Sequence, residues 1–302
     1  MRVVSVLPSA TEIVHALGHG PELVGRSAEC DFPSGVERLP VVMRARTLDS
    51  DRPSREIDRR VREARGRGES LYELDIDLLH LLAPDLILTQ DLCSVCSVTE
   101  TEVAEALTRA GVSPRVLSLT PRTLEDVWNS FGLIAAALGD STAGARLSRT
   151  VRERTTVPPP TTPRRRVAVV EWVDPPILAG LWTPDIIRAA GGDPIGPTSG
   201  SPGRSTTWGE LAVNQPDLVV LSPCSFSVAR TLRELDQFEV GRGAAGLTPA
   251  LGTYVADEAY FSRPGPRLAD GVRLIRNLLD GTPPERPMPV VRWEPPTTEV
   301  VA

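Results

Sequence analysis

The sequence predicts an α/β protein of two similar lobes with mostly parallel sheets, joined by a long connecting helix, with a ligand cleft between the lobes. One observation behind this fold class is an internal repeat, in which residues 2–7 and 83–88 have counterparts in residues 166–170 and 215–221. A second is the alternation of short β-branched segments with segments of helical periodicity, which is typical of a parallel sheet covered by helices. A third is a proline-free segment with helical periodicity at residues 123–155, which predicts the connecting helix.

The N-terminal lobe is expected to span residues 1–121. Its first strand runs into the sequence Ser9-Ala10-Thr11-Glu12, in which Ser9 and Glu12 are interpreted as a capping box at the start of a helix. A second strand is expected at residues 23–25 and delivers the polar loop 27–31. The remaining elements are expected in the order helix, strand, helix and strand, at residues 72–82, 85–89, 99–110 and 115–119.

The connecting helix is expected within residues 122–158, with an interruption near Gly139 and an end at a run of prolines. The C-terminal lobe is expected to span residues 164–281. Its helices are predicted near residues 184–190, 230–235 and 266–279. The tail at residues 282–302 is rich in proline and charge, so it is expected to lack regular structure.

Composition and charge limit the function. The net charge of -6 and the pI of about 5.3 argue against a nucleic-acid-binding protein, because phosphate binding needs a concentrated basic face. The arginine-rich stretch at residues 52–67 carries interleaved acidic side chains, so it is interpreted as a solvent-exposed helix. No apolar run approaches the roughly 20 residues that span a bilayer. The first strand begins beside Met1 with no leader ahead of it, which predicts a cytoplasmic location.

The cysteines follow the predicted strands at their carboxyl ends, which is where parallel α/β sheets bind ligands. They are Cys30, Cys93, Cys96 and Cys224. The spacing Cys93-Ser94-Val95-Cys96 places two sulfur atoms within reach of one metal ion. Four thiolates could hold zinc or an iron-sulfur cluster. Two alternatives stay open, namely free thiols that touch a ligand and cysteines that only pack in the protein.

Polar and aromatic side chains gather in the same predicted loops, where they form a candidate site for a large, flat ligand. The candidate ligand-binding residues are Ser9, Glu29, Gln90, Asp91, Glu171, Trp172, Asp174, Trp182, Ser225, Phe226, Tyr260 and Arg263. Asp31, like Glu12, is interpreted as a capping residue. Trp182 and Phe261 have the alternative role of sealing the core of the second lobe. The histidines lie away from these loops, so a Ser-His-Asp or Cys-His nucleophile has little support.

Several segments carry a resemblance to a known family. Residues 4–12, 84–87 and 215–219 resemble the helical-backbone, or class III, periplasmic substrate-binding proteins of transporters for cobalamin and iron complexes. The motifs at residues 29–31, 92–96, 171–176, 223–224 and 259–267 are similar to a leaderless cytosolic subgroup labelled cobalamin-binding by similarity. The chain departs from that subgroup at Ala28 and Leu181, where histidines are common, and at Ser225, where glycine is usual.

The resemblance implies a cytosolic protein that binds a metal-containing or large planar small molecule, cobalamin or an iron complex, in the interlobe cleft for sequestration or delivery. A transporter partner is not expected without a leader sequence. The alternative is a metalloenzyme of a specialised biosynthetic pathway that uses a cysteine-ligated iron-sulfur cluster or zinc in the same cleft. A third hypothesis is a scaffold that binds a partner protein. The sequence leaves open whether the protein is an enzyme.

Overall fold

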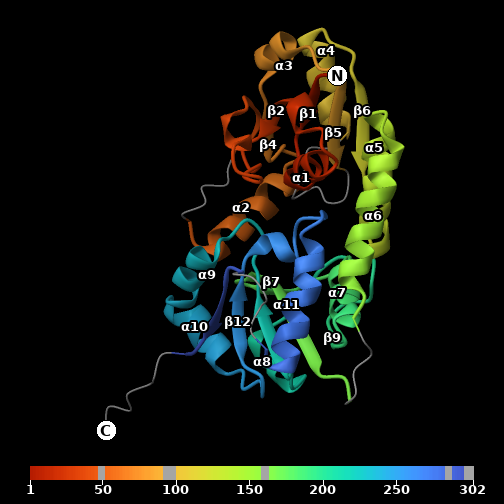
Figure 1. Ribbon diagram of the computed structural model, residues 1–302. Coiled ribbons are helices and arrows are strands. Elements are labelled where there is room, and N and C mark those ends of the chain that lie inside the picture. Colours follow the sequence, from red (N-terminus) through yellow and green to blue (C-terminus); the bar gives the residue numbers. More distant parts are fainter. Residues whose placement is uncertain (47–51, 91–99, 158–162, 283–287, 296–302) are drawn as a thin grey trace. The chain divides into compact units, whose positions relative to one another are not determined.

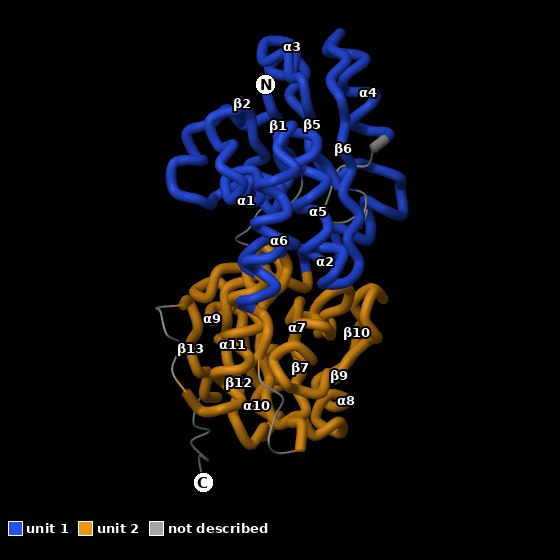
Figure 2. Tube along the Cα trace, turned by 45° about the vertical axis from the view of Figure 1, so that its right-hand side comes forward, with its two compact units in different colours: residues 1–52, 56–154, 263–267 blue, residues 53–55, 155–262, 268–302 orange. Residues whose placement is uncertain are grey.

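The computed structural model describes residues 1–46, 52–90, 100–157, 163–282 and 288–295. The chain divides into two compact units, coloured separately in Figure 2. Unit 1 comprises Met1–Arg52, Glu56–Arg154 and Arg263–Arg267, and unit 2 comprises Pro53–Arg55, Thr155–Ser262 and Leu268–Ala302. Each unit therefore contains a short segment from the half of the chain that builds the other unit.

Unit 1 is built on one sheet with the strand order β4-β3-β2-β1-β5-β6. Its strands are β1 (Val3–Ser5), β2 (Leu23–Ser27), β3 (Val41–Ala45), β4 (Tyr72–Leu74), β5 (Leu86–Gln90) and β6 (Arg115–Leu119). All neighbours pair in parallel except β3 and β4, which are antiparallel. The carboxyl ends of β1, β2 and β5 therefore lie at one edge of the sheet.

The helices of unit 1 are α1 (Pro8–Ala16), α2 (Ser54–Gly66), α3 (Ile76–Leu82), α4 (Glu100–Ala110), α5 (Leu124–Ala137) and α6 (Ser141–Thr155), and α2 begins in the segment assigned to unit 2. Val4 and Ile87 face a core that contains Leu79 from α3 and Val103 from α4. Because side chains alternate along a strand, Val3 points to the opposite face and is also fully buried. Two short 3-10 helices, Gly20–Glu22 and Val36–Arg38, lie in the connections.

Unit 2 contains a second sheet with the order β10-β8-β7-β11-β12-β13, and β9 pairs with β7. Its strands are β7 (Arg166–Val173), β8 (Pro176–Leu178), β9 (Asp193–Ile195), β10 (Arg204–Ser205), β11 (Leu218–Leu221), β12 (Thr253–Ala256) and β13 (Val290–Trp293). Strand β7 is parallel to β9 and β11, and β11 is parallel to β12. The carboxyl ends of β7, β11 and β12 thus form the edge that corresponds to the one in unit 1.

The helices of unit 2 are α7 (Thr183–Ala189), α8 (Trp208–Val213), α9 (Val228–Leu235), α10 (Phe238–Ala245) and α11 (Leu268–Asp280), with a 3-10 turn at Glu258–Tyr260. The core includes Val170 and Val219 from the central strands, with Leu211 from α8 and Leu235 from α9 packed against them. Helix α11 packs beside α7 and lies across the sheet in Figure 1. Among the described helices, none combines the length and the apolar character needed to cross a bilayer.

The predicted fold class is confirmed. The repeat corresponds to equivalent strand pairs, because β1 is parallel to β5 in unit 1 and β7 is parallel to β11 in unit 2. The connecting segment forms two consecutive helices, α5 and α6, and the break lies at the interruption expected near Gly139 (Figure 1). Gly139 between them has a φ of 81°, and the Oδ1 atom of Asp140 accepts a hydrogen bond from the Ala143 amide at 2.9 Å to start the second helix.

Two other segments differ from the sequence prediction. Tyr72–Leu74 forms β4 rather than the first turn of a helix, and α3 starts only after Asp75, whose Oδ1 atom accepts from the Leu78 amide at 2.9 Å. The alternating pattern of these residues pairs well with the edge of β3. The tail also contributes structure, because Val290–Trp293 pairs antiparallel with β12. Its β-branched residues suit a strand.

Candidate functional site

The described candidate residues lie at or beside the carboxyl ends of the parallel strands, in one group on each unit. The group on unit 1 contains Ser9, Glu29, Cys30, Gln90 and Arg263, and the group on unit 2 contains Glu171, Trp172, Asp174, Trp182, Cys224, Ser225, Phe226 and Tyr260. Asp91, Cys93 and Cys96 lie outside the described residues. Parallel α/β sheets bind ligands at this edge, so each group is in a position to contact one.

The loop that follows β2 in unit 1 is held at both of its ends by Arg26. The Nη1 atom of this buried arginine donates to the carbonyl oxygens of Ser27 and Ala28, at 2.9 and 3.2 Å, and its Nη2 atom donates to the Glu37 carbonyl oxygen at 2.8 Å. The Ser27 hydroxyl accepts a hydrogen bond from the Glu29 amide at 3.1 Å. The Glu29 carboxylate itself is exposed, and no ion pair involves it among the described residues.

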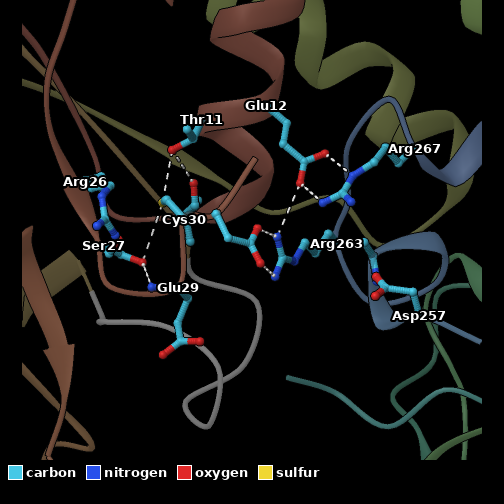
Figure 3. Close-up of polar contacts among 12 residues, drawn as sticks. Thr11, Glu12, Arg26, Ser27, Glu29, Cys30, Asp257, Arg263 and Arg267 are labelled. Carbon is cyan, nitrogen blue, oxygen red and sulfur yellow. Dashed lines mark hydrogen bonds and ion pairs between the residues drawn. The ribbon is translucent and has the colours of Figure 1, made fainter. Parts of the chain in front are cut away.

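Two arginines from the segment Arg263–Arg267 bind acidic side chains on unit 1 (Figure 3). The Arg267 guanidinium donates to both carboxylate oxygens of Glu12, with Nε to Oε2 at 2.9 Å and Nη2 to Oε1 at 2.5 Å. Arg263 binds both carboxylate oxygens of Asp31 and also lies 3.6 Å from Glu12. The Glu12 side chain is only 2% exposed, so its carboxylate is shielded from solvent.

These contacts correct the capping role expected for Glu12, and they give Asp31 an ion pair with Arg263. Helix α1 begins at Pro8 after Leu7, without a side-chain cap, so Ser9 and Glu12 form no capping box. Partial burial would raise the pKa of the Asp31 carboxyl, but hydrogen bonding and attraction from Arg263, with attraction from Arg267, outweigh it and lower the pKa. Arg263, predicted as a ligand-binding residue, has its charge compensated inside the protein by Asp31 and Glu12.

Cys30 lies within the packed interior of unit 1 and is 1% exposed. Its sulfur accepts a hydrogen bond from the Thr11 hydroxyl at 3.1 Å and lies 3.6 Å from the Ser27 hydroxyl. Burial raises the pKa of the Cys30 thiol despite these hydrogen bonds. Among the described residues no group of three acidic, histidine or cysteine side chains could hold a metal ion. The four-cysteine centre stays a prediction, because Cys93 and Cys96 lie outside that part of the chain.

We expect Cys30 to react with iodoacetamide at least about 10-fold more slowly than Cys224 at pH 8, because the reactive form is an accessible thiolate. Cys224 is partly exposed, whereas Cys30 is buried and its raised pKa keeps it protonated up to a higher pH. Peptide mapping by mass spectrometry after timed labelling gives both rates in the same sample. Labelling in denaturant should make the two rates similar, and equal rates in the native protein would contradict the buried position of Cys30.

On unit 2 an aromatic pair lies at the ends of β7 and β11. The rings of Trp172 and Phe226 have centroids 5.1 Å apart with an interplanar angle of 48°. The guanidinium of Arg230 lies over the Phe226 ring, 4.6 Å from its centroid, and pairs with Glu234 at 2.7 Å. Phe226 is buried, whereas Trp172 is partly exposed. Trp172 is therefore the member of this pair that can offer its indole to a ligand.

The other residues of this group have defined local roles. The Trp172 Nε1 atom donates to the Asp174 carbonyl oxygen at 3.1 Å, and the Asp174 carboxylate accepts from Arg55 Nε at 2.9 Å. Glu171 packs against Gly203, where any larger residue would overlap its carboxylate. Ser225 is exposed and adopts a φ of 62°.

Trp182 and Tyr260 are largely buried in unit 2. Trp182 is 5% exposed, and its Nε1 atom donates to the Phe261 carbonyl oxygen at 2.6 Å. Tyr260 is 9% exposed and Phe261 is 2% exposed. The packing role considered for Trp182 and Phe261 accounts for these contacts.

Phe32 was not among the residues predicted for the site, although it lies beside a motif that carries the resemblance. Phe32 follows the acidic loop residues directly and is 45% exposed, and the Arg267 guanidinium lies 4.5 Å from the centroid of its ring. The sequence signal for Phe32 is an aromatic residue in a loop after a parallel strand. Arg267 ends the segment 263–267, whose rigid turn at a helix start suggests an anion contact, but its partner Glu12 lies more than two hundred residues earlier in the chain.

The fold is that of the periplasmic binding proteins, as the resemblance in the sequence implied. One similar structure is a periplasmic heme binding protein from Pseudomonas aeruginosa, with a TM-score of 0.70, 19% identity and coverage of 97% of this chain and 98% of that chain. Another is the vitamin B12 binding protein BtuF of Vibrio cholerae, with a TM-score of 0.63, 19% identity and coverage of 92% and 96%. A third is an ABC-type Fe3+-hydroxamate transport system from Saccharomonospora viridis, with a TM-score of 0.64, 17% identity and coverage of 92% of each chain.

No protein-family model matches the chain, and no curated protein sequence matches it. At these identities the likeness concerns the fold, since one fold carries many functions.

Proposed function

We propose that this protein binds a large, flat, metal-containing small molecule, such as a haem, a corrinoid or an iron chelate, at the carboxyl edges of its sheets. The observation that carries the proposal is the partly exposed indole of Trp172, held at the ends of β7 and β11 by its tilted contact with the Phe226 ring and its hydrogen bond to the Asp174 carbonyl oxygen. An aromatic face fixed in this way suits a planar ligand, because offset stacking needs a ring of defined orientation.

The solved structures with the same fold support the class of ligand. Two of them are named for binding heme and vitamin B12, and the third is named for the transport of Fe3+-hydroxamate. These ligands differ in metal and size, but each is a metal complex with an organic shell. The proposal therefore concerns the class, and the choice among its members falls to direct binding measurements.

The polar residues at the edges support a ligand that has hydrogen-bonding groups around a flat body. On unit 2, Ser225 is exposed, and Glu171 is partly exposed beside Trp172. A few polar groups around an aromatic surface are typical of small-molecule sites, where they orient the ligand. The predicted cytoplasmic location and the role in sequestration or delivery are part of the proposal, and cell fractionation tests the location.

Binding should be visible in absorbance and tryptophan-fluorescence titrations with hemin, cyanocobalamin and ferrioxamine B as probes. We expect at least one probe to bind with a dissociation constant in the micromolar range or below. The substitution Trp172→Leu should weaken binding of that probe by about 10-fold, because a rigid aromatic contact is lost. Loss of a stack of this kind is expected to affect hemin and cyanocobalamin more than ferrioxamine B, which has no flat macrocycle.

The substitution Trp293→Leu is the matched control. Trp293 is also a partly buried tryptophan of unit 2, but it pairs with Thr253 at the amino end of β12, away from the candidate edge. It should leave affinity within about twofold of the wild type, which is the scatter expected for a side chain outside the site. Absence of binding for all three probes at micromolar protein would overturn the proposed function.

A further inference from the structure

Phe32 is an unusual side chain in unit 1 because it is both aromatic and well exposed. Among the large hydrophobic side chains in the described part of the chain, those that are strongly exposed are Met1, Phe32, Leu81, Leu133, Val213 and Val291. Phe32 is the only aromatic residue of that set and is 45% exposed. It lies in the loop after β2, at the edge where parallel sheets bind ligands.

The backbone on the amino-terminal side of Phe32 is fixed by several contacts that do not involve its own ring. Arg26 bridges the carbonyl groups of Ser27 and Glu37, so the two ends of the loop are tied to one guanidinium. Cys30 is buried and accepts a hydrogen bond from Thr11 (Figure 3). Asp31 binds Arg263. A loop constrained at this many points holds its exposed side chains in place before any ligand arrives.

The ring of Phe32 is fixed by a second layer of contacts. The Arg267 guanidinium lies 4.5 Å from the ring centroid, which is a cation–π distance. That guanidinium is held in its plane by two hydrogen bonds to Glu12, at 2.9 and 2.5 Å. Glu12 is buried and Phe32 is exposed. The series of side-chain contacts from Glu12 through Arg267 to Phe32 therefore runs from the interior of unit 1 to its surface.

We propose that Phe32 is the aromatic contact of unit 1 for a flat ligand and that Arg267 and Glu12 are its positioning residues. This inference rests on the proposed function and assigns a residue to it. The Phe32 ring remains 45% exposed although Arg267, which is paired with the buried Glu12, holds it. A ring held by such a pair offers an open surface in one fixed orientation, and stacking on a planar macrocycle requires that arrangement.

The test is a titration of wild type and three Phe32 variants with hemin and cyanocobalamin. Phe32→Ala should weaken binding of the better probe by about 5- to 10-fold, the range expected from loss of one aromatic stack. Phe32→Leu retains an apolar side chain without a flat face and should weaken binding nearly as much. Phe32→Trp retains a flat face and should bind within about twofold of wild type. Leu133→Ala, which removes an exposed apolar side chain from α5 of the same unit, should leave affinity unchanged.

The role of the positioning residues is tested by combining Phe32→Ala with Glu12→Gln. Glu12→Gln alone should weaken binding by about 3-fold, because the ring loses its fixed orientation. In the Phe32→Ala background the same substitution should have no further effect on binding, whereas a purely structural role of Glu12 would give additive losses. Thermal unfolding of each variant confirms that the measured protein is folded.

The outcomes separate this inference from the proposed function. If wild type binds a probe and the Phe32 variants all bind it equally well, Phe32 is no ligand contact and the inference is overturned, while the proposed function stands. If Phe32→Trp loses as much affinity as Phe32→Ala, the flat-surface role is wrong. If wild type binds neither probe nor ferrioxamine B, both proposals fail together.

Discussion

Replacing Glu234 with alanine is expected to lower the free energy of unfolding of unit 2 by about 3–5 kcal/mol, the cost of removing one partner from a buried ion pair. Glu234 is fully buried on α9, and its carboxylate lies 2.7 Å from Arg230, which is 7% exposed. The same carboxylate accepts hydrogen bonds from the amide and the hydroxyl of Ser54, at 3.0 and 2.5 Å. Ser54 is the first residue of α2, so Glu234 also compensates the positive end of that helix.

The measurement is urea unfolding followed by hydrogen exchange of peptides from unit 2, since a two-unit protein need not unfold in one step. Glu234→Gln keeps the size and one acceptor oxygen and should cost less, about 1–3 kcal/mol. Asp280→Ala is the control, because Asp280 also pairs with an arginine of unit 2, but at an exposed position at the end of α11. Its cost should stay within about 0.5 kcal/mol. Similar costs for Glu234→Ala and Asp280→Ala would show that the buried pair contributes no special stability.

The sequence predicted those parts of the fold that depend on local pattern. The strands β1, β5, β7 and β11 are short β-branched segments, and their repetition along the chain is enough to identify two equivalent halves. The exchange of Pro53–Arg55 and Arg263–Arg267 between the units could not be predicted. Such segments have no periodicity of their own, and their positions depend on partners that are distant in the chain.

The sequence indicated where the candidate residues lie in the fold, but it did not indicate which side chains they pair with. The rule that ligands lie at the carboxyl ends of parallel strands pointed to Glu29 and Ser225, which lie in loops after β2 and β11, and to Trp172, which lies near the carboxyl end of β7. The local pattern gave Glu12 a local partner, Ser9, because capping boxes are recognised from residues three apart. The structure gives it Arg267 instead, 255 residues away, where a guanidinium binds both carboxylate oxygens. A buried carboxylate is stabilised more by a bidentate guanidinium than by one backbone amide. The residues near Glu12 in the sequence give no indication that its partner is Arg267.

Replacing Glu12 with alanine is expected to lower the free energy of unfolding of unit 1 by about 3–5 kcal/mol, again because a buried carboxylate is removed from its cationic partners. Arg267 would lose both of its hydrogen bonds to carboxylate oxygens, and Arg263 would retain Asp31. The segment Arg263–Arg267 should therefore exchange its amide hydrogens faster than in wild type. Peptide-resolved hydrogen exchange measures both the local effect and the stability of unit 1 in the same experiment.

Asp31→Ala provides the matched control for this segment. Asp31 pairs with the same stretch of chain, but its side chain is 65% exposed, so solvent screens the interaction and the cost should stay near about 1 kcal/mol. The two variants thus remove one carboxylate each from neighbouring arginines and differ mainly in burial. A larger cost for Asp31→Ala than for Glu12→Ala would mean that the exposed pair, rather than the buried one, holds Arg263–Arg267 on unit 1. The positioning role inferred for Glu12 would then lose its structural basis, because the Arg267 guanidinium beside Phe32 would not depend on it.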